Sequence, residues 1–78
     1  MIKAYVLVVT NPGETKSVVA AAKGIKGVQE LHEVMGPYDI VIEIEVESLS
    51  DVPPILSDKI RTVPGIESTT SLVTFPDS

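Results

Sequence analysis

The sequence repeats one pattern twice, at an offset of 38 positions, the step from Ile2 to Ile40. Residues 2–8 align with residues 40–46, and residues 25–30 align with residues 63–68. Two separate blocks share this offset, which argues against coincidence. Each copy reads as a strand, a helix, a glycine turn and a second strand, so the chain is expected to contain two strand–helix–strand units.

Helical spacing of apolar residues marks the middle of each unit. The first helix is expected over residues 14–23, after the break at Asn11-Pro12-Gly13, and Gly24 is placed to end it. The second helix is expected after Ser50-Asp51, with Pro53-Pro54 in its first turn, where a missing N–H costs little. The apolar stripe of the first helix is Val18, Ala21, Ala22 and Ile25, and that of the second is Val52, Leu56, Ile60 and Val63.

The two strands that open the units differ in how their apolar residues are placed. In residues 40–46 the isoleucines alternate with Val41 and glutamates, which is typical of a strand with one buried face. The strand that begins at Ile2 is apolar on both faces, so each face needs a covering layer. Two helices cover only one face, and the other is expected to pack on the sheet of a second subunit. The residues expected at this interface are Tyr5, Leu7 and Val9.

The order of these elements predicts the α+β class and a ferredoxin-like βαββαβ sandwich. This fold is a four-stranded antiparallel sheet with two helices on one face. We expect the strands that begin at Ile2 and Ile40 to lie at the centre of the sheet, as a parallel pair. The second strand of each unit is expected at an edge. Residues 1–78 are expected to form a single domain.

The chain is both short and apolar. Of its 78 residues 44% are hydrophobic, and its mean hydropathy is +0.29. A chain of this length buries only about 60% of its unfolded surface, so a monomer has too little interior for so many Val, Ile and Leu residues. The surplus is expected to form a subunit interface.

Charge and composition exclude several classes of partner. The net charge is −5 at pH 7 and the six Lys and Arg residues form no cluster, which argues against direct binding to nucleic acid or to an anionic membrane. The absence of cysteine excludes disulfides and thiolate ligands. No apolar run reaches the roughly 18 residues of a membrane span, and no secretory signal follows Met1, so the chain is expected to be cytoplasmic.

No catalytic group, metal site or cofactor is expected. The single histidine, His32, lies in a predicted edge strand without a nucleophile, and it reads as an edge or interface residue. Glu43, Glu45 and Glu47 share a strand face, but neighbours there lie about 6.5–7 Å apart, too far for two of them to chelate one ion. These carboxylates are expected to be solvated or paired at an interface, with Lys3 or a lysine of another chain as the partner.

The turn Gly36-Pro37-Tyr38-Asp39 is the best functional clue in the sequence. Gly36 can adopt positive φ and Pro37 fixes φ at about −65°, so the backbone of this corner is restricted. The turn reads either as a structural hairpin, in which Asp39 bonds to nearby backbone N–H groups, or as a small polar pocket. In such a pocket Asp39 would take an ammonium group and exposed N–H groups a carboxylate. A second source of hydroxyls is the run Thr69, Thr70 and Ser71.

Four features together resemble the ligand-binding (RAM) domain of the Lrp/AsnC regulators. The resemblance covers essentially the whole chain, and the Gly-x-Tyr-Asp hairpin is its most specific part. The features are Pro12-Gly13 before the first helix, Gly27-Val28 at the second strand, Gly36-Pro37-Tyr38-Asp39 followed by Ile40-Val41, and Pro64-Gly65-Ile66 leading into Thr69-Thr70.

The resemblance implies a non-enzymatic module that binds an amino acid and regulates through ligand-linked assembly. Such domains form dimers by sheet-on-sheet packing, the dimers join into octamers or decamers, and the amino acid binds between dimers. By position, the hairpin would form one wall of the site and hydroxyls of a neighbour would add polar contacts. The implied ligand-binding residues are Gly36, Tyr38, Asp39, Thr69, Thr70 and Ser71.

Full-length members of this family carry a helix-turn-helix domain before the matching region. Met1 leaves no room for one, so we expect a stand-alone form that joins full-length regulators or modulates an enzyme. Two other readings stay open. An ACT-like regulatory domain has the same topology, but its sheets pair side by side. A small cofactor-free enzyme would use a cavity between sheet and helices lined by His, Trp or Asn, whereas this chain has one His and no Trp.

Overall fold

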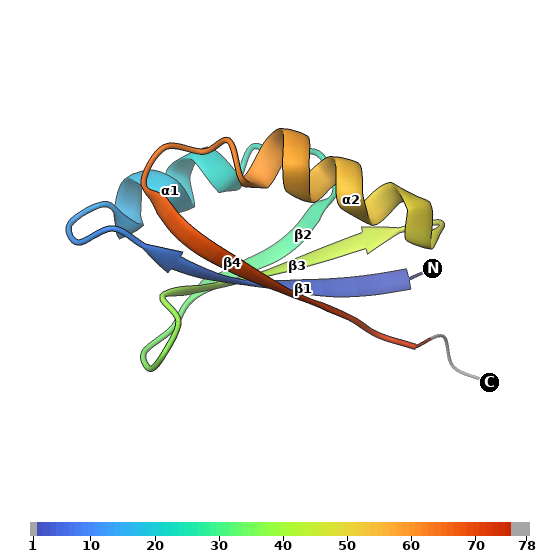
Figure 1. The fold of residues 1–78 in the computed structure, drawn as a ribbon, viewed down its shortest axis with the longest axis horizontal. Helices are drawn as coiled ribbons and strands as arrows, with labels where there is room; N and C mark the ends of the chain where they lie inside the picture. The colour runs from blue at the N-terminus through green and yellow to red at the C-terminus, as the bar shows by residue number, and fades with distance from the viewer. Residues whose placement is uncertain (1, 76–78) are drawn as a thin grey trace.

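Four strands form one sheet, and the helical segments all lie over one of its faces (Figure 1). The computed structural model describes residues 2–75. A 3-10 turn, a single α turn and a π-helix follow one another directly and make up the second helix of the chain. The elements are β1 (Ile2–Thr10), α1 (Thr15–Ala22), β2 (Val28–Glu33), β3 (Ile40–Val46), η1 (Leu49–Asp51), α2 (Val52–Pro54), η2 (Ile55–Ile60) and β4 (Ile66–Val73).

The internal repeat is visible in the structure, because matching elements begin at matching positions. β1 and β3 begin at Ile2 and Ile40, and β2 and β4 begin at Val28 and Ile66. Both pairs of starting residues are separated by the 38 positions found in the sequence. The two strand–helix–strand units interleave in one sheet, as the repeat predicts.

The strands are ordered β2-β3-β1-β4, which puts β1 and β3 at the centre and β2 and β4 at the edges, as predicted. The expectation of a parallel central pair is wrong, because β1 pairs with β3 antiparallel, with Ala4 opposite Ile44. The reason lies in the chain path. The crossover through α1 gives β2 the direction of β1, and the hairpin that follows reverses the chain, so β3 must oppose β1. Every neighbouring pair is antiparallel, as in a ferredoxin-like sandwich.

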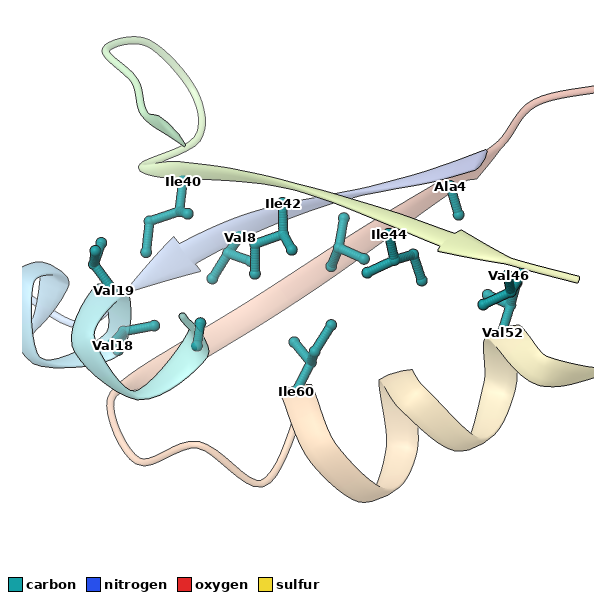
Figure 2. Packing of buried hydrophobic residues seen from close by; sticks show 12 residues of the cluster. Ala4, Val8, Val18, Val19, Ile40, Ile42, Ile44, Val46, Val52 and Ile60 are labelled. Carbon is teal, nitrogen blue, oxygen red and sulfur yellow. The ribbon is translucent and has the colours of Figure 1, made fainter. Parts of the chain in front are cut away.

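The core lies between the sheet and the helical segments. Val6 and Ile42 are fully buried, whereas Leu7 and Val41 are half-buried on the other face. β3 therefore has the one buried face that the sequence predicts, and β1 is apolar on both of its faces, as expected. Opposed residues of antiparallel strands share a face, so β1 and β3 present one aliphatic layer to the helices. Figure 2 shows this layer facing the helical side chains. The buried hydrophobic residues are Ala4, Val6, Val8, Val18, Val19, Ala22, Ile40, Ile42, Ile44, Val46, Val52 and Ile60.

The second helix is not the regular α-helix that the sequence predicts. Pro53-Pro54 lies in its first turn, as expected. In η2, however, the Arg61 N–H donates to the Leu56 carbonyl at 2.8 Å, five residues back, as in a π-helix. Ile55 and Ile60 are also five residues apart, and both pack into the core. The apolar stripe of this helix is assigned with the α-helical period of 3.6 residues per turn, and that period does not predict the wider π-helical turn.

Each half of the molecule has a turn glycine that packs against the helix of the other half. Gly27 and Gly65 occupy matching positions of the repeat, with φ of +102° and +98°. A Cβ added at Gly27 would lie 3.2 Å from Cδ1 of Ile55 in η2. A Cβ added at Gly65 would lie 2.7 Å from Oε2 of Glu14 and 3.0 Å from Cγ2 of Val18. The predicted turn glycines are therefore confirmed, and the second turn is the more crowded.

Gly65→Ala is expected to destabilise the protein more than the matched substitution Gly27→Ala. Both place a Cβ on a positive-φ backbone, a strain of about 1–3 kcal/mol. Only Gly65→Ala also forces the Cβ against Val18, whereas Ile55 Cδ1 is the free end of a side chain. Overpacking of this kind costs about 1–3 kcal/mol more, which urea unfolding would resolve. Equal losses from the two variants would contradict this packing difference.

Candidate functional site

The predicted hairpin is a loop of residues 34–39 that projects from the sheet on the side away from the helices (Figure 1). Its base is closed by the Val34 N–H, which donates to the Asp39 carbonyl at 2.9 Å. Gly36 has a φ of +137°, which confirms the positive φ expected there. Met35 is fully exposed, whereas Tyr38 and Asp39 are half-buried where the loop rejoins the sheet.

Hydrogen bonds of Asp39 connect this hairpin to the end of β1. Its Oδ2 accepts hydrogen bonds from the Thr10 backbone N–H at 2.9 Å and from Thr10 Oγ1 at 3.2 Å. The Asp39 N–H donates to the Val8 carbonyl at 2.8 Å. Thr10 Oγ1 lies 2.7 Å from Oγ1 of Thr15, the first residue of α1. One chain of bonds therefore joins the hairpin, β1 and α1.

The Asp39 carboxylate thus has a structural task. Thr10 is only 7% exposed, so its N–H and hydroxyl need partners within the protein. If the turn is a structural hairpin, the sequence predicts that Asp39 bonds to nearby backbone N–H groups. The N–H that it binds is close in space but 29 positions away in the chain. A further role for Asp39 as the acceptor of a ligand ammonium stays a prediction.

The hydroxyl run Thr69–Ser71 lies on the edge strand β4 and is divided between its faces. Thr69 lies opposite Val8, and Thr70 lies opposite Leu7. Since opposed residues share a face, Thr69 and Ser71 lie on the helix side and Thr70 lies on the open side of the sheet. Thr69 is half-buried, and the other two are exposed.

Within one protomer the hairpin and the hydroxyl run do not meet. Asp39 bonds to Val8 from one side of β1, and Thr69 pairs with Val8 from the other. Two strand spacings, roughly 10 Å, therefore separate their backbones. An amino-acid head group is too small to contact both, so a site that uses both would combine parts of different protomers.

The face of the sheet away from the helices carries the predicted interface residues. Tyr5, Leu7 and Val9 alternate along β1 with the buried residues and are themselves half-buried. Leu72 lies opposite Tyr5 on β4 and is 52% exposed. Together with Val41 of β3, these side chains form an apolar patch that we call the open face.

Two hollows lie largely outside the residues that the sequence singled out. A polar crevice of about 250 Å³ lies between the end of η2 and the start of β4. A wider groove of about 580 Å³ lies at the other end of the sheet, where Gly27, Val46 and Ile55 border it. Only Thr69 of the crevice was expected to bind a ligand. The residues that line the crevice are Arg61, Ile66, Glu67, Ser68 and Thr69.

The single histidine and the carboxylates of β3 lie apart from the hairpin and the hydroxyl run. His32 is exposed on β2, opposite Val41. Between residues 2 and 75, no three His, Asp or Glu side chains gather closely enough to hold a metal ion. Glu43 lies 3.9 Å from the Lys3 ammonium, which confirms the predicted partner. Over the same described range, no helix has both the length and the apolar character needed to cross a membrane.

A family model described as the Lrp/AsnC ligand binding domain matches residues 3–76. An uncharacterized HTH-type transcriptional regulator of Pyrococcus furiosus is 31% identical over 75 residues, which cover 92% of this chain and 50% of the relative. The chain therefore spans about half the length of the curated regulators it matches. A homocitrate synthase of Sulfolobus acidocaldarius is 38% identical over 60 residues, which cover 76% of this chain and 13% of that enzyme.

Solved structures agree with the fold. A protein of Thermus thermophilus superposes with a TM-score of 0.93 at 26% identity, over 100% of this chain and 98% of that chain. AsnC of E. coli superposes with a TM-score of 0.90 at 22% identity, over 97% of this chain and 52% of that chain. Both likenesses confirm the predicted ferredoxin-like sandwich.

Asp39→Ala is expected to destabilise the fold by about 1–3 kcal/mol in urea unfolding, because it leaves the buried Thr10 N–H without its acceptor. Asp39→Asn keeps an oxygen in place and should lose less. Met35→Ala, on the same loop but fully exposed, is the matched control and should change stability by less than about 0.5 kcal/mol. Wild-type stability for Asp39→Ala would show that the tie to β1 contributes nothing.

Proposed function

This chain belongs to the Lrp/AsnC ligand-binding domain family, and we propose that it is a regulatory module that binds an amino acid and couples binding to assembly. The family is one of transcription regulators, which supports a regulatory rather than a catalytic role for this chain. The proposed partners are further copies of this chain and full-length Lrp/AsnC-type regulators. The net charge of −5 argues against direct contact with DNA.

The observation that carries the proposal is the apolar open face. The helices cover only one side of the sheet (Figure 1). The strand register and the burial pattern place Tyr5, Leu7 and Leu72 on the other side. A second copy of the chain is the occupant we propose, because a two-fold axis would set the same patch on itself and bury both copies. Sheets that stack in this way lie about 10 Å apart, with interdigitated side chains. Octamers or decamers would then be assemblies of such dimers.

The proposed ligand site lies between protomers of different dimers. The hairpin of one protomer supplies Gly36, Tyr38 and Asp39, and the hydroxyl run of another supplies Thr69, Thr70 and Ser71. Their separation across β1 supports this arrangement, since one protomer does not bring the two groups together. Support for an amino acid as ligand comes from the family and from a solved relative, a transcriptional regulator of Neisseria meningitidis in complex with L-Met.

The proposed mechanism is linkage between binding and assembly. A ligand that contacts two protomers binds only where both are present, so it stabilises the assembly that contains the complete site. The free energy by which the ligand stabilises this assembly grows as RT ln(1 + [L]/Kd). It reaches about 2.7 kcal/mol when the ligand concentration is 100 times its Kd. Changes in amino-acid concentration would thereby change the size or the stability of the oligomer.

Control of an enzyme is a second candidate function. A segment 38% identical to this chain occupies 13% of a homocitrate synthase of Sulfolobus acidocaldarius. A segment similar to this chain is thus present in a protein of a different class from the HTH-type regulators. In that case the same ligand-linked assembly would act on catalytic domains instead of on a DNA-binding domain.

Leu7→Asp is expected to dissociate the proposed dimer. It puts a carboxylate in the middle of the open face, where it would be buried without a partner in the assembly. Light scattering should then report monomer at concentrations at which the parent chain is dimeric or larger.

The matched control for this variant is Leu49→Asp. Leu49 is 57% exposed in η1, on the helix side of the molecule, so the same substitution there should leave the oligomer intact. An unchanged oligomer in Leu7→Asp, or equal dissociation in both variants, would contradict dimerisation through the open face.

A thermal-shift screen of the twenty L-amino acids tests ligand binding. At about 10 mM, a ligand with a Kd of about 0.1 mM should stabilise the protein by about 2.7 kcal/mol, which raises the Tm of a domain of this size by about 10 °C or more. One or a few amino acids should produce such a shift, accompanied by a change in light scattering. No shift with any of the twenty would contradict the proposed ligand class.

A further inference from the structure

The polar crevice between η2 and β4 combines opposite charges with hydroxyl groups in a small space. Arg61 lies directly after η2, whereas Glu67, Ser68 and Thr69 belong to β4, so two separate elements form its walls. The hollow has a volume of about 250 Å³. Pockets for drug-sized ligands measure about 300–1,000 Å³, so the crevice suits a small head group rather than a large molecule.

The two charged residues of the crevice form no ion pair with each other within 4.0 Å. The ion pairs formed among residues 2–75 join Lys3 to Glu43 and Lys16 to Glu33, so Arg61 and Glu67 are more than 4.0 Å apart in their charged atoms. Arg61 and Glu67 thus line the same hollow without forming an ion pair with each other. Such an arrangement complements a ligand that carries both a negative and a positive group.

Both walls are positioned by the backbone. The Arg61 N–H donates to the Leu56 carbonyl at 2.8 Å, which fixes the point where Arg61 leaves the π-helix. On the other wall, Ser68 pairs with Val9 and Ile66 pairs with Thr10, so Glu67 is an extra residue without a partner on β1. A bulge of this kind re-aims side chains at the edge of a sheet.

We propose that this crevice binds the head group of the amino acid, with Arg61 on the α-carboxylate and Glu67 on the α-ammonium. The planar guanidinium matches a carboxylate with two parallel hydrogen bonds, and the Ser68 and Thr69 hydroxyls supply additional donors and acceptors. This assignment deepens the proposed function and rests on it. It makes the crevice the part of the intersubunit site that recognises the zwitterion.

The bonding of Asp39 supports this assignment. One oxygen of that carboxylate already accepts two hydrogen bonds from Thr10, so it is engaged in holding the hairpin. Thr69 belongs both to the crevice and to the hydroxyl run, so the crevice is continuous with the wall proposed to face a neighbouring hairpin. The hairpin, through Tyr38, is then left to contact the side chain of the amino acid.

The test is calorimetric titration of the full chain with the amino acid identified among the twenty, followed by two charge-removing variants. Arg61→Gln and Glu67→Gln should each weaken binding by about tenfold or more, since each removes a charged hydrogen-bond partner. The control variants are Lys59→Gln and Glu30→Gln, exposed residues outside the crevice that carry the same charges. These should bind like the parent, and unchanged melting temperatures would verify that all four variants are folded.

Ligand analogues and spectroscopy locate the contacts. The amine that lacks the α-carboxylate should bind the parent weakly, and Arg61→Gln should weaken it no further. Backbone amide signals of residues 66–69 should shift on titration with the amino acid. Parent-like affinity in both Arg61→Gln and Glu67→Gln would overturn the assignment and leave the proposed function standing. If none of the twenty amino acids bound the parent, both the head-group assignment and the proposed function would be contradicted.

Discussion

The aliphatic layer formed by β1 and β3 is the constraint on which the rest of the structure depends. Isoleucines of β3 lie opposite small or β-branched residues of β1, as Ile42 does opposite Val6, and each isoleucine that is fully buried contributes about 1.5–3 kcal/mol. Because side chains alternate, the register that buries Val6 also places Leu7 on the open face, and a slip of one residue would exchange the two faces. The core and the proposed dimer interface are therefore encoded by the same strand.

Much of the fold could be predicted because the repeat and the alternation of side chains are local signals. The residues that begin β1, β2, β3 and β4 follow from the repeat. Two features could not be obtained in this way. The direction of β3 relative to β1 depends on the whole chain path, and counting elements led to the wrong orientation. The π-helix depends on how the segment 55–60 meets the sheet, because its apolar residues are compatible with an ordinary α-helix as well.

The candidate site was less predictable, because its contacts join residues that are far apart in the sequence. The hairpin stood out through its Gly-Pro-Tyr-Asp composition, yet nothing near Asp39 in the sequence indicates that Thr10 would bind its carboxylate. Arg61 and Glu67 carry no motif, and they line one crevice only because η2 ends beside the start of β4. Residue type thus suggests where a ligand binds, whereas the partners of each charge follow only from the packing of the elements.

The proposed mechanism links amino-acid binding to assembly. Native mass spectrometry, with and without the amino acid, tests it most directly, because it counts the protomers and the bound ligands in each particle. We expect dimers and multiples of dimers, with the amino acid retained in the assemblies that contain complete intersubunit sites. A chain that stays monomeric under all conditions, or one that binds ligand equally in every oligomeric state, would contradict it.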